Sequence, residues 1–249
     1  MRVIGVVSGK GGVGKTTLVA NLGTTLVKHF GKSVAILDTN LSTPNLSMHF
    51  GLDYFPVTLR EVLNKNVPIL ESVYIHPHTG LRIIPAPINL DKNHLKNLRK
   101  IIKLKKLIKK LNYDFIIADS SPGLGLEAVS TMKVVDEVIG VTTPDLPSVT
   151  DVSKALEIAR TLGKDVLGVI VNRWKSGGLL VPDIEYLCGT HVISVIPEDL
   201  KVPISISSGT PVILHKEYAK ASTEFKKIAA FLLGKTYRPS ILERIKKMF

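Results

Sequence analysis

Residues 8–17, SGKGGVGKTT, combine closely spaced glycines with lysines and threonines in a pattern suited to holding phosphate groups. Residues 9–16 fit the pattern G-x-x-x-x-G-K-[ST]. Glycines let a backbone wrap closely around an anion, so that successive N–H groups point at it. A helix that begins at this loop adds the positive end of its dipole. We therefore expect the loop to bind a nucleotide through Gly9, Lys10, Gly11, Gly12, Val13, Gly14, Lys15, Thr16 and Thr17.

Three side chains of this loop have distinct expected roles. Lys15 should reach the β- and γ-phosphates, and the Thr16 hydroxyl should hold Mg²⁺. Thr17 is placed to touch the α-phosphate. The expected cofactors are therefore ATP or ADP together with Mg²⁺.

Apolar runs around the loop predict the elements that position it. Residues 3–7 predict a buried strand before the loop, and residues 16–29 predict a helix after it. Two further apolar runs end in aspartates, Asp38 and Asp119. The run that ends at Asp119 fits the Walker B pattern, whose carboxylate holds Mg²⁺ directly or through water. The expected metal ligands are Thr16, Asp38 and Asp119.

Composition limits the class of protein. A chain of 249 residues that is 45% hydrophobic can form one α/β core. No apolar run approaches the roughly 18–20 residues of a membrane span, and the residues before the loop are too few for a signal peptide. A single cysteine, Cys188, fits a reducing cytoplasm. The net charge of +12 indicates an anionic partner, either nucleic acid or an acidic membrane.

Lys10, directly after the first glycine, makes the stretch a "deviant" Walker A loop. The stretch therefore resembles the MinD/ParA family of P-loop ATPases. The resemblance covers nearly the whole chain and implies an α/β P-loop NTPase fold, with a mostly parallel twisted sheet flanked by helices on both faces. It also implies an ATP-sandwich homodimer in which Lys10 reaches the nucleotide of the partner subunit.

Two further segments resemble the switches of this family. Switch I, residues 38–46, has Asn40 where the family carries a second aspartate that orients the attacking water. An amide can accept a hydrogen bond but cannot act as a carboxylate base, so slow hydrolysis is expected. The resemblance implies a catalytic set of Lys10, Lys15, Asp38 and Asn40. Switch II, residues 119–125, has one extra serine between Asp119 and Pro122.

Two turns resemble the adenine pocket of the family. Asn172 and Arg173 end an apolar strand, and an amide suits adenine because it both donates and accepts. Pro197, Glu198 and Asp199 resemble a V-P-E-D segment whose backbone lines the base pocket. The resemblance implies that these five residues hold the base.

Residues 92–110 form the most basic stretch, with nine Lys or Arg and no acid. Their apolar positions recur at helical spacing, so we expect one amphipathic helix packed on the sheet with its lysines outward. The basic face is either simply solvated or a surface that attracts anions. The second alternative would allow nucleic-acid binding.

Residues 235–249 follow the main domain, residues 1–234, as a separate tail. Ser240 and Glu243 form an S-x-x-E capping box. The apolar side of the helix that follows would consist of Ile241, Leu242, Ile245, Met248 and Phe249. This short helix either docks on the globular body or lies in a membrane surface. MinD proteins end in a similar basic amphipathic helix, which favours the membrane.

Together, these features predict a MinD-like ATPase that binds ATP and Mg²⁺, dimerises, and associates reversibly with acidic lipids at the inner face of the cell membrane. It would be cytoplasmic and would position division or other cell-surface machinery through a regulatory or cargo protein. The alternatives are a ParA-like DNA-binding partition ATPase and a nucleotide-locked scaffold with weak or no hydrolysis. A membrane helix on each subunit of a dimer would strengthen binding by roughly 10²–10⁴.

Overall fold

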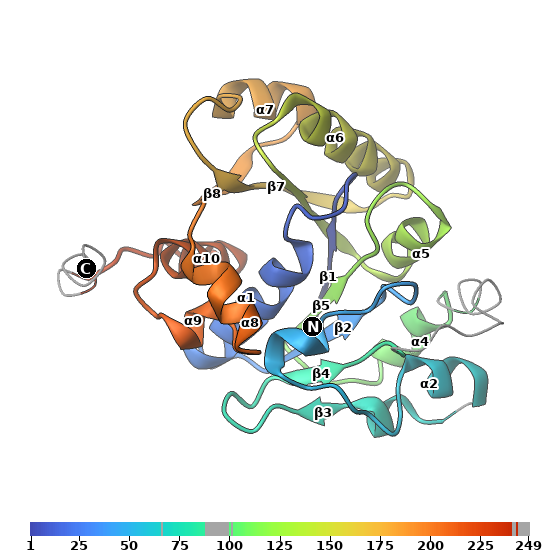
Figure 1. The fold of residues 1–249 in the computed structure, drawn as a ribbon. Helices are drawn as coiled ribbons and strands as arrows, with labels where there is room; N and C mark the ends of the chain where they lie inside the picture. The colour runs from blue at the N-terminus through green and yellow to red at the C-terminus, as the bar shows by residue number, and fades with distance from the viewer. Residues whose placement is uncertain (66, 88–99, 101, 241–242, 244–249) are drawn as a thin grey trace.

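A twisted sheet forms the centre of the protein (Figure 1). The computed structural model describes residues 1–65, 67–87, 100, 102–240 and 243. In this part of the chain the sheet has eight strands in the order β3-β4-β2-β5-β1-β6-β7-β8. Neighbouring strands are parallel except for β3 and β4, which are antiparallel. The strands are β1 (Arg2–Val7), β2 (Val34–Asp38), β3 (Tyr74–Ile75), β4 (Arg82–Ile84), β5 (Phe115–Asp119), β6 (Glu137–Thr142), β7 (Asp165–Trp174) and β8 (Val192–Pro197).

Helices cover both faces of this sheet. Figure 1 shows α1, α9 and α10 on one side and α2, α4 and α5 on the other. The helices are α1 (Lys15–Lys28), α2 (Leu59–Lys65), α4 (Leu104–Ile108), α5 (Leu126–Val134), α6 (Leu146–Thr161), α7 (Val181–Cys188), α8 (Lys201–Ser207), α9 (Val212–His215) and α10 (Lys220–Leu232), with short 3₁₀ turns η1 (Ser47–Phe50) and η2 (Ile69–Ser72). The expected α/β fold with a mostly parallel sheet and helices on both faces is confirmed.

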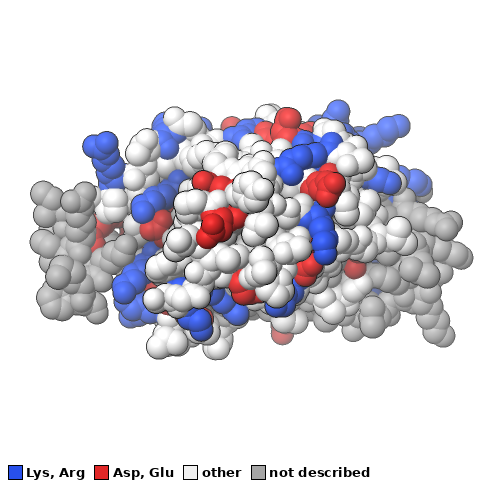
Figure 2. Space-filling model, turned by 90° about the horizontal axis from the view of Figure 1, so that it is seen from above, with Lys and Arg blue, Asp and Glu red and all other residues white. Residues whose placement is uncertain are grey.

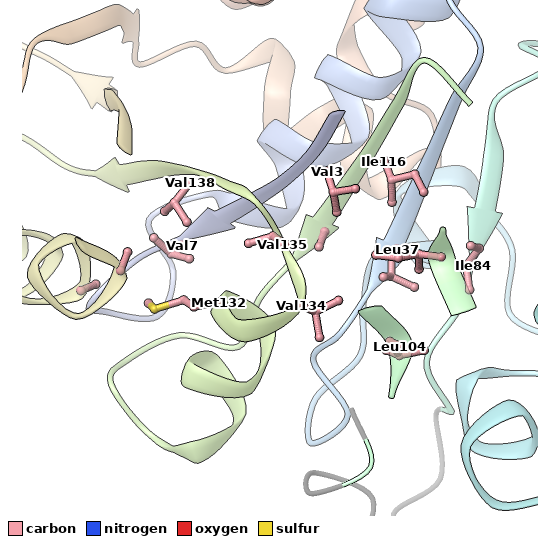
Figure 3. Close-up of a cluster of buried hydrophobic side chains, with 14 of the residues drawn as sticks. Val3, Val7, Leu37, Ile84, Leu104, Ile116, Met132, Val134, Val135 and Val138 are labelled. Carbon is pink, nitrogen blue, oxygen red and sulfur yellow. The ribbon is translucent and has the colours of Figure 1, made fainter. Parts of the chain in front are cut away.

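Two hydrophobic cores lie on opposite faces of the sheet because successive strand side chains point to opposite sides. Ala35 and Leu37 of β2 enter one core, whereas Ile36 enters the other. Figure 3 shows the first core, where side chains from β1, β2, β4 and β5 meet Met132 of α5 and Leu104 of α4. The central strands are buried on both faces, as expected for parallel strands covered by helices.

The basic stretch, residues 92–110, differs from the expected single helix. Lys100 is helical, Ile102 and Lys103 form a turn with short-range hydrogen bonds, and α4 follows the turn. Leu104 and Ile108 of α4 are buried in the first core. One uninterrupted helix is therefore wrong for the described part. Residues 92–99 and 101, which carry part of that prediction, lie outside the described residues.

The start of the tail is attached to the globular body. The amide of Glu243 donates to Ser240 Oγ at 3.2 Å, and Glu243 Oε2 accepts from the Ser240 amide at 2.9 Å. The predicted capping box is thus confirmed. Glu243 also accepts hydrogen bonds from Lys226 of α10 and from the Tyr237 hydroxyl. The five apolar residues expected to enter a membrane lie outside the described residues: Ile241, Leu242, Ile245, Met248 and Phe249.

Within the described residues, no helix has the length and apolar character needed to cross a bilayer.

Candidate functional site

The glycine-rich loop joins the carboxyl end of β1 to the first residue of α1. Gly14, the last residue before the helix, has φ +97°, which a side chain would strain. A Cβ at Gly14 would also lie 2.2 Å from Asn172 Nδ2. Asn172 comes from the end of β7 and donates through Nδ2 to the carbonyl of Val13 at 2.7 Å. The loop conformation is therefore held from another strand.

Two aspartates lie side by side at the carboxyl ends of β2 and β5. Asp38 and Asp119 are register partners in these strands, and both are buried. Asp38 accepts hydrogen bonds from the amides of Asn40 at 3.0 Å and Leu46 at 3.2 Å. Asp119 Oδ2 accepts from the Thr16 hydroxyl at 2.6 Å. The strand order thus brings together the three residues that the sequence predicts as metal ligands.

Burial controls the charges of these groups. Burial raises the pKa of Asp119 to about 6, although Lys15 and the Thr16 hydroxyl oppose the shift. Burial, and then the neighbouring Asp119 charge, raise the pKa of Asp38 well above its ordinary value. Burial lowers the pKa of the Lys15 ammonium, while Asp119 and Asp38 oppose that shift. Asp38 and Asp119 thus lie close together in a buried site that disfavours their negative charge.

This setting fits a divalent cation. Asp119 Oδ1 is buried and has no hydrogen-bond partner among the described residues. An unpaired buried carboxylate oxygen is costly, and a cation would remove the cost. The Thr16 hydroxyl lies beside it, and hydroxyl and carboxylate oxygens are ligands that Mg²⁺ prefers. Thr16 and Asp119 are therefore the residues that would hold the ion directly, with Asp38 behind them.

A cavity of about 340 Å³ opens above the loop. Its lining includes Lys15, Thr16, Thr17 and Asn40, together with Gly11, Gly12 and Gly14. A second cavity of about 260 Å³ is lined by Asn172, Arg173, Pro197, Glu198 and Asp199, all of which the sequence analysis assigned to base binding. Gly14, Thr17, Arg173 and Ile206 line both cavities. The two cavities therefore adjoin, as the phosphate and base sites of one nucleotide would.

Two residues of the second cavity have structural contacts of their own. Asn172 uses one of its amide N–H groups on Val13, which leaves its other polar atoms for a base. Asp199 accepts from the amides of Lys201 and Ala221, at the starts of α8 and α10. Its carboxylate thereby orders the two helices that border the cavity.

Lys10 lies apart from the buried lysine of the loop. Its side chain is 53% exposed, and its ammonium lies 3.5 Å from Ser148 Oγ and 4.0 Å from Asp145 Oδ1. Both partners belong to the start of α6. Lys10 therefore extends along the surface beside the site, whereas Lys15 is buried within it.

Asn40 is fully engaged by the two switch segments. Its Oδ1 accepts from Ser121 Oγ at 3.0 Å and from the Thr43 amide at 3.2 Å. Its Nδ2 donates to the Thr43 carbonyl at 2.9 Å. Ser121 is one of the two serines between Asp119 and Pro122, where the family pattern has one residue. Its hydrogen bond to Asn40 joins the two switch segments.

Sequence reasoning missed two residues of the site. Glu127, at the start of α5, accepts from the amides of Leu41 and Ser42 and from the Ser42 hydroxyl. His49 lines the phosphate cavity and contacts Thr17. Neither residue lies in a motif. The only available signal was that Glu127 and His49 each follow a switch segment closely in the chain.

A third cavity, of about 620 Å³, lies beside the base cavity and shares Arg173 and Glu198 with it. Its other walls are the loops that follow β6 and β7. No sequence motif indicated this space.

The chain is similar to known nucleotide-binding proteins. A family model described as the CobQ/CobB/MinD/ParA nucleotide binding domain matches residues 4–212. A Methanocaldococcus jannaschii protein, described as an uncharacterized ATP-binding protein, is 36% identical over 243 residues, covering 97% of this chain and 91% of that protein. The septum site-determining protein MinD of Pyrococcus horikoshii OT3, solved with Mg-ADP, has a TM-score of 0.86 at 31% identity and covers 98% of each chain. MinD of Aquifex aeolicus, solved in a MinC:MinD complex, has a TM-score of 0.84 at 30% identity, covering 96% of this chain and 99% of that one.

Proposed function

The chain belongs to the CobQ/CobB/MinD/ParA family of nucleotide-binding domains, and from this premise we propose that it is a MinD-like ATPase. It binds ATP or ADP with Mg²⁺, forms a homodimer in the ATP state, and associates reversibly with acidic membrane lipids. It is cytoplasmic and peripheral on the inner face of the cell membrane. There it positions division or other cell-surface machinery through a regulatory or cargo protein.

The observation that carries this proposal is the unpaired Asp119 Oδ1 beside the Thr16 hydroxyl and the buried Lys15. A buried cation and two buried carboxylates under a glycine-rich loop match the needs of a nucleotide phosphate chain with its metal. Bound Mg²⁺ would supply charge neutralisation at the β- and γ-phosphate oxygens. Lys15 would add its positive charge from the base of the loop, and the loop amides would donate to the phosphates.

Two features support the dimer and membrane parts of the proposal. Lys10 is on the surface beside the site, where a second subunit could be reached. The tail begins with a formed capping box, so a helix is favoured in the residues after it. The relative solved with Mg-ADP and the one solved with MinC support a nucleotide cofactor and a protein partner respectively.

Calorimetry with ADP, with and without Mg²⁺, tests nucleotide binding. The unmodified chain should bind ADP more tightly with Mg²⁺, and Asp119→Asn should lose most of that gain. Asp165→Asn, at an exposed strand end, is the matched control and should bind like the unmodified chain. Equal Mg²⁺ dependence in Asp119→Asn would contradict the assigned metal site.

Co-sedimentation with anionic liposomes tests the membrane part. Pelleting should require ATP rather than ADP, and it should vanish for a chain that ends at Arg238. Equal pelleting in both nucleotides would indicate simple charge attraction. Failure to pellet would remove membrane binding from the proposal and leave DNA as the anionic partner to test.

One alternative has a specific observation in its favour. The amide of Asn40 is occupied by Ser121 and Thr43, which favours a nucleotide-locked scaffold with weak or no hydrolysis. Single-turnover hydrolysis of bound ATP distinguishes the scaffold from an ATPase.

The ParA-like alternative depends on residues 92–110, of which residues 92–99 and 101 lie outside the described residues. On the face in Figure 2, Lys and Arg side chains alternate with Asp and Glu, so the described residues there form no continuous basic surface. At the start of α4, Lys105 pairs with Asp136 at 3.2 Å. Steep salt dependence of DNA binding would support this alternative.

A further inference from the structure

His49 lies where the two parts of the candidate nucleotide site meet. It belongs to η1, which packs against α1 and α8, and its side chain is only 7% exposed. It lines the phosphate cavity directly. Its Nε2 lies 3.2 Å from the hydroxyl of Thr17, a residue that lines both the phosphate and the base cavity. The imidazole thus contacts a residue that the phosphate and base cavities share.

The second ring nitrogen determines which way the hydrogen bond to Thr17 runs. His49 Nδ1 lies 3.2 Å from the backbone carbonyl of Asn45, and a carbonyl only accepts. Nδ1 therefore carries the proton. Burial lowers the pKa of His49, although the bond to the Asn45 carbonyl opposes the shift, so the ring is neutral near pH 7. In a neutral ring with Nδ1 protonated, Nε2 can only accept, and the Thr17 hydroxyl must donate to it.

The charged residues that line the cavity with His49 are cations. They are Lys15 of α1 and Arg173 of β7, and the described residues of that lining include no carboxylate. On α8, Ile206 lines the cavity, whereas Lys201 is five positions away, about 7.5 Å along the helix. The other residues of η1 with His49 are Ser47, Met48 and Phe50. Among the described residues that line this cavity, none supplies a negative charge to a protonated ring, whereas a bound phosphate would.

Resting on the proposed nucleotide binding, we propose that His49 is a proton-linked residue of the nucleotide site that positions the Thr17 hydroxyl. In the empty site, the Thr17 hydroxyl donates to His49. A phosphate that binds beside Thr17 accepts that hydroxyl hydrogen instead, and Nε2 is left without a donor. His49 then takes one proton from solvent and donates its new N–H to Thr17 Oγ or to the phosphate.

Proton uptake has a direct consequence for affinity. The protonated form of His49 is favoured in the nucleotide complex and disfavoured in the empty site. Nucleotide binding therefore becomes tighter as the pH falls from above the pKa of His49 in the complex toward the pKa of His49 in the empty site. For one proton, the largest effect is about tenfold in Kd per pH unit. This pH dependence requires the histidine at position 49, and an apolar residue there would abolish it.

The test is calorimetric titration with Mg-ADP between pH 8 and pH 6, on the unmodified chain and on His49→Gln. Glutamine can donate and accept but does not titrate in this range. Comparison of the two proteins cancels the protonation of ADP itself. His78→Gln makes the same change at an exposed histidine and is the matched control. Titration of the unmodified chain in two buffers of different ionisation enthalpy measures proton uptake without any variant.

We expect Kd for the unmodified chain to fall by up to about tenfold per pH unit relative to His49→Gln. Mg²⁺ also displaces protons from Asp119 and Asp38, so the readout is a difference between proteins. We expect the unmodified chain and His78→Gln to take up more protons on binding than His49→Gln, by up to one proton. Identical pH profiles in the unmodified chain and His49→Gln would overturn the role of His49 and leave nucleotide binding standing. If His49→Gln does not fold, His49→Asn takes its place, and proton uptake equal to that of the unmodified chain then overturns the role of His49. If the unmodified chain fails to bind Mg-ADP at every pH, the proposed function fails and this inference fails with it.

Discussion

The hydroxyl of Ser121 donates a 3.0 Å hydrogen bond to Oδ1 of Asn40, and this bond joins the segments that follow β5 and β2. Both side chains are buried. Position 40 is where the family resemblance places a water-orienting carboxylate. In this chain an amide stands at that position, and its oxygen accepts from a serine of switch II. The departure in switch I is therefore in direct contact with the segment of switch II that departs from the family pattern.

Asn40→Asp should raise ATP hydrolysis by roughly 100-fold, the lower range for a positioned general base. A carboxylate at this position would be repelled by the Thr43 carbonyl, now 2.9 Å from Nδ2, and would turn toward the cavity. Single-turnover hydrolysis with radiolabelled ATP measures the effect. Asn40→Ala removes the tie without adding a base, so it should not raise the rate. An unchanged rate in Asn40→Asp would show that position 40 does not limit turnover.

Glu127→Gln should loosen switch I. The Glu127 carboxylate accepts from the amides of Leu41 and Ser42, and hydrogen bonds to a charged group contribute about 1.5–3 kcal/mol. Loss of the charge should speed hydrogen exchange at both amides by at least about tenfold, which corresponds to about 1.4 kcal/mol. Glu157→Gln, on the exposed side of α6, is the control and should leave these amides unchanged. Unchanged protection in Glu127→Gln would mean that other contacts hold the segment.

Gly14→Ala should destabilise the protein and abolish nucleotide binding. The residue has φ +97°, and backbone strain of this kind costs about 1–3 kcal/mol. The new Cβ would also displace Asn172 from Val13, because it would lie 2.2 Å from Asn172 Nδ2. Gly31→Ala separates the two causes, since Gly31 has φ +61° and open space around its Cβ. Denaturant unfolding should show the larger loss for Gly14→Ala, and equal losses would argue against the clash.

Glu243→Gln should weaken the attachment of the tail in a pH-dependent way. Burial alone raises the pKa of Glu243, but hydrogen bonds from Lys226 and Tyr237 outweigh it and lower the pKa to about 2. A depressed carboxylate pKa contributes stability that is present above its ordinary value of 4.5 and is lost as the pH falls toward 2. At pH 7 the variant should melt about 2–4 °C lower, for a loss of about 1 kcal/mol.

The melting difference of Glu243→Gln should shrink as the pH is lowered from 4.5, because the carboxylate of the unfolded chain then binds a proton while the native carboxylate, with a pKa of about 2, stays ionised. Thermal unfolding followed by circular dichroism measures it. Glu71→Gln, at an exposed glutamate, is the control and should show no such difference. A melting difference that stayed constant down to pH 3 would point to lost packing rather than lost charge.

Local pattern was enough to predict the α/β class and the phosphate-binding loop. The glycine spacing of residues 9–16 dictates a backbone conformation by itself, and apolar runs that end in Asp38 and Asp119 indicate buried parallel strands. Local pattern failed at Ile102 and Lys103, where a turn interrupts the helical periodicity just before the buried Leu104. Periodicity describes which residues face inward, but it does not say whether one helix can reach the core without a break.

Only the tertiary structure shows which side chains hold the glycine-rich loop and the two switch segments in place. Asn172 reaches Val13 across 159 positions, Ser121 reaches Asn40 across 81, and His49 reaches Thr17 across 32. These contacts arise because the carboxyl ends of parallel strands meet at one edge of the sheet, in an order that differs from the order in the chain. A motif records residues that are close in sequence. The partners that orient this loop and its switches are brought to it by strand order, which no local pattern contains.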